Sequence, residues 1–159
     1  MTATALVTKD SLNQMLMQAD NAKRIHIIGR ALVGLFERQT AAEQSSDVTT
    51  NDNGIGFASS DARTGSLTAK SYIARQNLVQ WQIDQWMRPS HGYPRICKYA
   101  RQLNEIAVEK RQRTQAGAPA RLKVLRYELG MVQDSDDDKL IDPIARQIKQ
   151  LDQLISTQQ

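Results

Sequence analysis

Apolar side chains recur at helical spacing along most of the chain. The clearest case in the first half begins near Asn21, where one helix face would carry Ile25, Ile28, Leu32, Leu35 and Phe36. Shorter stripes of the same period over residues 10–16, 66–76 and 78–87 predict further helices. The chain has few aromatic residues, so Leu, Ile, Val, Met and Ala must fill the core. The pattern predicts an all-α fold, a compact multi-helix domain with an amphipathic helix at its C-terminal end.

The first long helix and the segment after it contain glycines and turn-forming residues. Gly29 and Gly34 each lower intrinsic helix stability by about 1 kcal/mol, which favours a role in close helix packing. Residues 45–60 are polar and predict a loop, preceded by one turn with the capping-box spacing of Thr40 and Glu43. Ser59, Ser60 and Asp61 end this loop as good N-cap residues. A phosphate cradle at its glycines is the weaker interpretation, because the spacing fits no known phosphate loop.

The tryptophan segment, residues 77–87, has a pattern that favours two interpretations. Two short helices joined at Asn77 have the outline of a helix-turn-helix, but the second one lacks the arginines and lysines of a recognition helix. Trp86 lies on the apolar stripe and is predicted to anchor the core. Trp81 lies off that stripe, so it is either a second core anchor or part of a contact surface together with Gln82 and Gln85.

The strongest predicted helix spans residues 94–113 and has a basic flank. Pro94 suits its first turn, and an apolar stripe runs through Ile96, Tyr99 and Leu103. Cations near the end of a helix stabilise its dipole, whereas Arg95 and Lys98 lie near the start, where positive charge is unfavourable. Those two are therefore the first candidates for contacting an anion. The full set of candidate nucleic-acid-binding residues is Arg95, Lys98, Arg101, Lys110, Arg111 and Arg113.

The C-terminal part is predicted as a separate region. Residues 114–119 indicate a linker, and residues 120–130 a helix, with an edge strand as the alternative. An acidic loop follows, and Asp142-Pro143 is a good helix start. The last helix carries a heptad seam of Ile141, Ile144, Ile148, Leu151 and Ile155, so it must dock on the domain or pair with a second copy as a homodimer. We expect a helical domain over residues 1–130 and the acidic loop plus helix over 131–159.

The charge distribution is more informative than the net charge of +4. Residues 77–130 contain ten Lys or Arg against four acids, whereas residues 131–159 contain six Asp against three cations. Such asymmetry favours an anionic partner for the middle of the chain. The alternative is a solvated surface on which charges happen to cluster.

Several classes of protein are not favoured by the sequence. One cysteine suits a reducing compartment, no run approaches the ~18 apolar residues of a membrane span, and residues 1–14 do not resemble a secretion signal, so we expect a cytoplasmic protein with no membrane partner. His26, His91 and Cys97 lack the spacing of metal ligands, and the acidic run lacks the glycine and glutamate of a calcium loop. We expect no enzyme, no metal and no cofactor.

The middle third of the chain resembles small plasmid- and phage-encoded proteins in which a GF-x3-DA motif precedes a KY-x2-QL segment. The matching positions are Gly56, Phe57, Asp61, Ala62, Leu78, Gln82, Lys98, Tyr99, Gln102 and Leu103. Trp81 departs from the pattern, which has Lys or Pro there. The resemblance implies a setting beside nucleic-acid-handling proteins of mobile genetic elements.

Two functions follow as hypotheses. The first is a non-enzymatic DNA-binding or RNA-binding accessory protein of a mobile element, which contacts nucleic acid through the basic flank of the 94–113 helix. The second is a protein-interaction module, an inhibitor or adaptor that engages a host protein. It is favoured by the heptad seam, the acidic loop and the lack of a clear recognition helix.

Overall fold

The computed structural model describes residues 6–47, 54–132 and 138–157, and almost all of them are helical. This confirms the all-α prediction. The chain divides into two compact units, Met1–Ile106 and Ala107–Gln159. The division lies earlier than the boundary expected near residue 130, and it falls inside a helix. The acidic loop expected near 131–138 lies almost wholly outside the described residues.

The first unit begins with two helices whose starts are capped by side chains. Helix α1 (Lys9–Gln18) is capped by Thr8, which exchanges a capping box with Ser11. Helix α2 (Asn21–Glu37) is capped by Asp20, whose carboxylate accepts the Lys23 N–H at 2.7 Å. The predicted face of α2 points inward, with Ile28, Leu32 and Leu35 fully buried.

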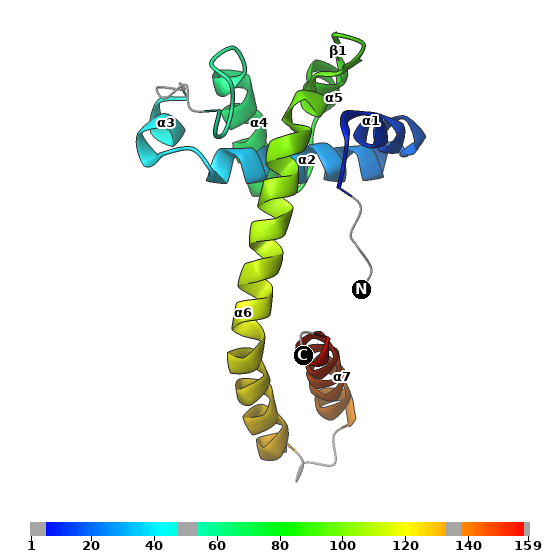
Figure 1. Cartoon of the computed structure of the whole chain (residues 1–159), viewed down its shortest axis with the longest axis vertical. Helices are drawn as coiled ribbons and strands as arrows, with labels where there is room; N and C mark the ends of the chain where they lie inside the picture. The colour runs from blue at the N-terminus through cyan, green and yellow to red at the C-terminus, as the bar shows by residue number, and fades with distance from the viewer. Residues whose placement is uncertain (1–5, 48–53, 133–137, 158–159) are drawn as a thin grey trace. The chain divides into compact units, whose positions relative to one another are not determined.

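Three further helices complete the scaffold of this unit. Helix α3 (Ala41–Ser46) starts with the predicted capping box of Thr40 and Glu43. Helix α4 (Ala62–Arg75) lies against α2, as Figure 1 shows, and helix α5 (Gln80–Met87) follows it. The α2–α4 contact depends on Gly29, because a Cβ there would lie 2.3 Å from the ring of Tyr72. The predicted packing role of Gly29 is confirmed.

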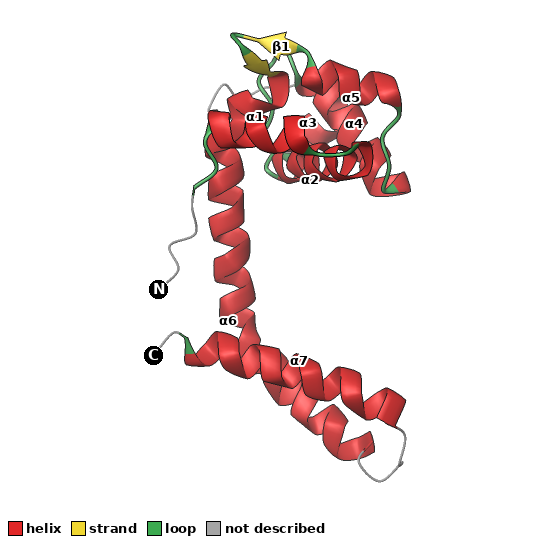
Figure 2. Cartoon of the chain, turned by 90° about the vertical axis from the view of Figure 1, so that its right-hand side faces the viewer, coloured by secondary structure: helices red, strands yellow, loops and turns green. Residues whose placement is uncertain are grey.

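A small hairpin follows α5 and replaces the start of the expected 94–113 helix. Strands β1 (Pro89–Ser90) and β2 (Tyr93–Pro94) pair antiparallel across the two-residue turn His91-Gly92, which Figure 2 shows beside α1 and α5. Both turn residues have positive φ, 53° and 83°, as a primed hairpin turn requires. The segment Arg95–Tyr99 is a 3₁₀ helix, η1, and α-helix α6 (Ala100–Val132) begins only after it.

The single 94–113 helix predicted from sequence is therefore wrong at both ends. Its start is a strand and a 3₁₀ turn, and its end continues through the expected linker 114–119 and the expected second helix. Pro119 lies inside α6 although its ring removes one backbone hydrogen bond. Burial compensates for that loss, because Ala118, Leu122 and Leu125 beside it are buried.

The core of the first unit is one cluster drawn from all its main elements. It includes Leu16 from α1, Leu32 from α2, Tyr72 from α4, Trp86 from α5 and Ile96 from η1. Trp86 is fully buried and donates its indole N–H to Thr68 at 3.4 Å, which confirms its predicted role as a core anchor. Phe57, at the end of the polar loop, joins the same cluster.

The second unit is a pair of helices, the later part of α6 and helix α7 (Asp138–Ser156), which lie side by side in Figures 1 and 2. Helix α7 starts earlier than Asp142, so Pro143 lies inside it. The predicted seam residues Ile144, Ile148 and Leu151 are half-buried, and Arg126 of α6 donates to Asp152 of α7 at 2.9 Å. Part of the seam is thus buried within the second unit of the same chain. A homodimer through α7 stays a prediction.

Among the described residues, no helix combines the length and apolar character that crossing a membrane requires.

Candidate anion-binding site

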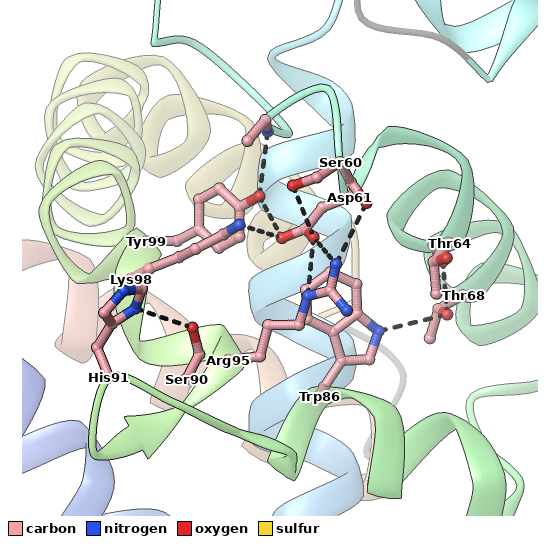
Figure 3. Close-up of polar contacts among 11 residues, drawn as sticks. Ser60, Asp61, Thr64, Thr68, Trp86, Ser90, His91, Arg95, Lys98 and Tyr99 are labelled. Atoms are coloured by element: carbon pink, nitrogen blue, oxygen red, sulfur yellow. Dashed lines mark hydrogen bonds and ion pairs between the residues drawn. The ribbon is translucent and has the colours of Figure 1, made fainter.

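The most polar part of the first unit is built around a buried carboxylate. Asp61 is the N-cap residue of α4, but its side chain makes no capping hydrogen bond and has no solvent exposure. Instead it accepts from η1: Arg95 donates from Nε at 2.8 Å and also from Nη2, and Lys98 Nζ lies 2.6 Å away. Figure 3 shows these groups converging on Asp61.

The 3₁₀ geometry of η1 explains why two cations meet one carboxylate. In a 3₁₀ helix residues i and i+3 lie in line, so Arg95 and Lys98 share one side. Ile96 and Tyr99, also three apart, share the side that enters the core. The same spacing that predicted an exposed basic flank therefore places its first two members against Asp61.

Tyr99 completes the hydrogen bonding of Asp61. Its hydroxyl donates to the second carboxylate oxygen at 2.8 Å and accepts the Ala58 N–H at 3.1 Å. Burial alone would raise the pKa of Asp61, but hydrogen bonds from Arg95, Lys98 and Tyr99 outweigh burial and hold it below its usual value. Burial and the neighbouring carboxylate raise the pKa of Tyr99, which stays a neutral donor.

The residues of the GF-x3-D and KY-x2-Q segments pair one with another in this region. Gly56 exchanges two hydrogen bonds with the Gln102 side chain, at 2.9 and 3.1 Å. The Phe57 ring meets the Tyr99 ring edge-on at a centroid distance of 6.1 Å. Asp61 binds Lys98 and Tyr99 as described above. These residues thus hold the end of the polar loop onto η1 and the first turns of α6.

A pocket of about 600 Å³ opens beside this cluster. Its lining includes four cations, which come from three places in the first unit: the start of α1, the end of α5 and η1. The lining residues with side chains suited to an anion are Lys9, Ser60, Arg88, Ser90, His91, Arg95 and Lys98. The hairpin forms one wall, with the Ser90 hydroxyl 3.2 Å from Nδ1 of His91. The chemistry of this lining makes the pocket a candidate site for an anion.

The cations of this pocket have N–H groups that are available to donate hydrogen bonds to a ligand. The side chains of Arg95 and Lys98 are 21% and 35% exposed. Arg95 uses Nε and Nη2 for Asp61 and the Ser60 carbonyl, and Nη1 has no hydrogen bond to the described part of the chain. Lys9 and Arg88 are exposed and have no carboxylate partner among the described residues. Asp61 thus positions two cations without occupying all their donors.

The other predicted basic residues do not join this pocket. Arg101 is exposed and lies 3.6 Å from Glu105, one turn along α6. Lys110, Arg111 and Arg113 are exposed residues of α6 in the second unit. At 100° per residue those three spread over about 160° of the helix surface, so they do not form one stripe.

The predicted surface around Trp81 is only partly present. Trp81 is 61% exposed, and Gln85 is half-buried. Gln82 is only 5% exposed, because its side-chain oxygen accepts the Val79 N–H at 3.0 Å and caps α5. Gln82 is therefore a structural residue and not part of a contact surface.

Sequence reasoning missed Lys9, Arg88, His91 and the role of Asp61. Lys9 is the first residue of α1, so it is a cation at a helix start, where positive charge is unfavourable. Arg95 was selected for the same reason. Nothing local marks Arg88 or Asp61, because their meeting depends on how α1, the hairpin and η1 pack. Within the described residues, no three His, Cys, Asp or Glu side chains gather as metal ligands.

Comparisons of the chain with protein-family models, with curated proteins and with solved structures gave no match.

Proposed function

We propose that this protein is a non-enzymatic nucleic-acid-binding protein that contacts phosphate groups at the basic pocket of its first unit. The observation that supports it best is the convergence of Lys9, Arg88, Arg95 and Lys98 on one pocket of about 600 Å³. Phosphate groups are the usual partners of such clusters, since each neutralised phosphate also releases condensed counterions. An accessory role in a mobile element and a cytoplasmic location belong to the same proposal.

The buried ion pairs add a second argument. A carboxylate that holds Arg95 and Lys98 in place reduces the side-chain entropy that binding would otherwise cost. The exposed cations of α6 in the second unit can add contacts of lower specificity. Sequence preference is not part of the proposal, because phosphate contacts position a protein without reading bases.

Arg88→Gln tests the proposal, because Arg88 is exposed and its loss should leave the core intact. Binding to a single-stranded oligonucleotide is measured by fluorescence anisotropy across a salt series. We expect the wild type to lose affinity steeply with salt, and the variant to bind more weakly with a salt slope smaller by about 0.7.

Arg30→Gln is the matched control, an exposed arginine of α2 outside the pocket lining, and it should behave like the wild type. No binding at low salt, or equal weakening by both variants, would reject the pocket as the binding site.

A second candidate function is a protein-interaction module, and the exposed Trp81 favours it. A large apolar ring that is 61% exposed is typical of a contact residue. A host protein that stays bound after nuclease treatment, is lost with Trp81→Ser and is kept with Arg88→Gln would favour this function over the first.

A further inference from the structure

The four cations in the lining of the basic pocket come from separate segments of the first unit. Lys9 comes from the start of α1, Arg88 from the junction of α5 and β1, and Arg95 with Lys98 from η1. Proteins that track along a strand place cations in a groove, so that successive phosphates meet successive side chains. Four cations in the lining of one pocket are suited instead to one highly charged group.

The walls of the pocket limit what can enter. The hairpin turn at His91-Gly92 closes one side, and Figure 3 shows Ser90 and His91 near Lys98. A volume of about 600 Å³ is in the range of pockets for small ligands. It suits a ligand about the size of one nucleotide.

The charge of the pocket matches a dianion. Two of its four cations, Arg95 and Lys98, are paired with the carboxylate of Asp61, and a second carboxylate, Asp10, accepts from the pocket residue Tyr93 at 2.7 Å. Two positive charges remain in excess. A phosphomonoester carries about −1.5 to −2 charges at pH 7 and three terminal oxygens, whereas an internal phosphodiester carries one charge.

We propose that the pocket binds the terminal phosphomonoester of a nucleic-acid strand, so that the protein recognises phosphorylated strand ends. This inference rests on the proposed function and names its ligand. Lys9, Arg88, Arg95 and Lys98 supply the charge, with Nη1 of Arg95 and the unpaired N–H groups of Lys98 as donors. The Ser60 hydroxyl donates to Asp61 at 3.4 Å, whereas the Ser90 hydroxyl lies in the same lining and can turn from His91 to donate to the third oxygen.

The test compares three single-stranded oligonucleotides of one sequence, with a 5′-phosphate, with a 3′-phosphate and with hydroxyl groups at both ends. Each carries its fluorescent label in the middle, and binding to the full chain is followed at moderate salt. We expect one of the phosphorylated strands to bind at least tenfold more tightly than the hydroxyl-ended strand. A nucleoside monophosphate serves as a competitor, because it presents the same group without a strand.

Arg88→Gln and Lys9→Gln test the pocket itself. Both residues are exposed and unpaired among the described residues, so both variants should fold. In each variant, the affinity for the phosphorylated strand should fall close to the affinity for the hydroxyl-ended strand, so that their ratio is near one. Arg30→Gln and Lys23→Gln, exposed residues of α2 with matched charge change, should leave the ratio unchanged.

The outcomes separate this inference from the proposed function. Equal and salt-dependent binding of all three strands would overturn end recognition while the proposed function stands. No binding of any strand would overturn both. If a nucleoside monophosphate bound as tightly as the phosphorylated strand, the pocket would be a site for free nucleotides. That result would overturn the proposal that the pocket recognises nucleic-acid strands.

Discussion

Asp61 is a fully buried carboxylate on which Arg95, Lys98 and Tyr99 converge. It is fully buried and still ionised, because Arg95, Lys98 and Tyr99 replace the water that it loses. Removing one partner of a buried ion pair is costly, since the remaining charges lose their compensation. The site and the stability of the fold are therefore linked through one carboxylate.

Asp61→Asn should destabilise the first unit by about 3 kcal/mol at pH 7, measured by urea unfolding. The folded-state pKa of Asp61 is lowered, so its stabilising effect is complete above the unfolded pKa and is lost as pH falls through the folded one. The difference in unfolding free energy between variant and wild type should thus shrink below about pH 4. Asp84→Asn, an exposed aspartate of α5, is the control. A difference that does not depend on pH would contradict an ionised Asp61.

Gly29→Ala should destabilise the first unit by about 2 kcal/mol despite the better helix propensity of alanine. The added methyl group would lie within 2.6 Å of three carbon atoms of the Tyr72 ring, which is buried and hydrogen-bonded to His26. Thermal unfolding measures the effect. Gly117→Ala in α6 is the matched control, because its new methyl group meets no atom within 4 Å and should be neutral or stabilising.

At the scale of the element, η1 and α6 show how packing overrides local signals. Pro94 suggests a helix start, yet the chain forms a strand and a 3₁₀ turn, because that geometry brings Arg95 and Lys98 to Asp61. The segment 114–119 contains Gly and Pro and suggests a linker, yet α6 continues through it. Both errors arise where burial outweighs intrinsic propensity.

Pro119→Ala should stabilise the second unit by about 1 to 3 kcal/mol, since it restores a backbone hydrogen bond of α6. The measurement is helicity by circular dichroism during thermal unfolding. Pro89→Ala in β1 lies outside any helix and should give no such gain. A loss of stability with Pro119→Ala would show that the packing with α7 needs the proline.

For the whole molecule, the two units differ in the size of their cores. The first has a cluster of sixteen buried residues, whereas the buried apolar residues described in the second are Ala118, Leu122 and Leu125. Local opening costs less where fewer apolar contacts must break. The two units are thus not expected to be equally stable.

Hydrogen exchange of the full chain should show this difference. Amides of α2 and α4 should exchange with a higher opening free energy than amides of α7, because Ile144, Ile148 and Leu151 of α7 are only half-buried. Equal protection across α2 and α7 would mean that the chain unfolds as one cooperative unit.

The sequence by itself determined the helical class, the inward face of α2, the capping box of α3 and the burial of Trp86. Each of these depends on periodicity or on contacts within one turn, which a linear pattern records. It also selected Arg95 and Lys98, by their unfavourable place at a helix start.

Only the tertiary structure decided what those two cations do. Asp61 lies 34 residues before Arg95, and Lys9 comes from the other end of the unit. A pocket is made by side chains that are distant in sequence, so no local pattern can record it. The packing of α1, the hairpin and η1 turned an expected basic flank into a pocket with a buried carboxylate beneath it.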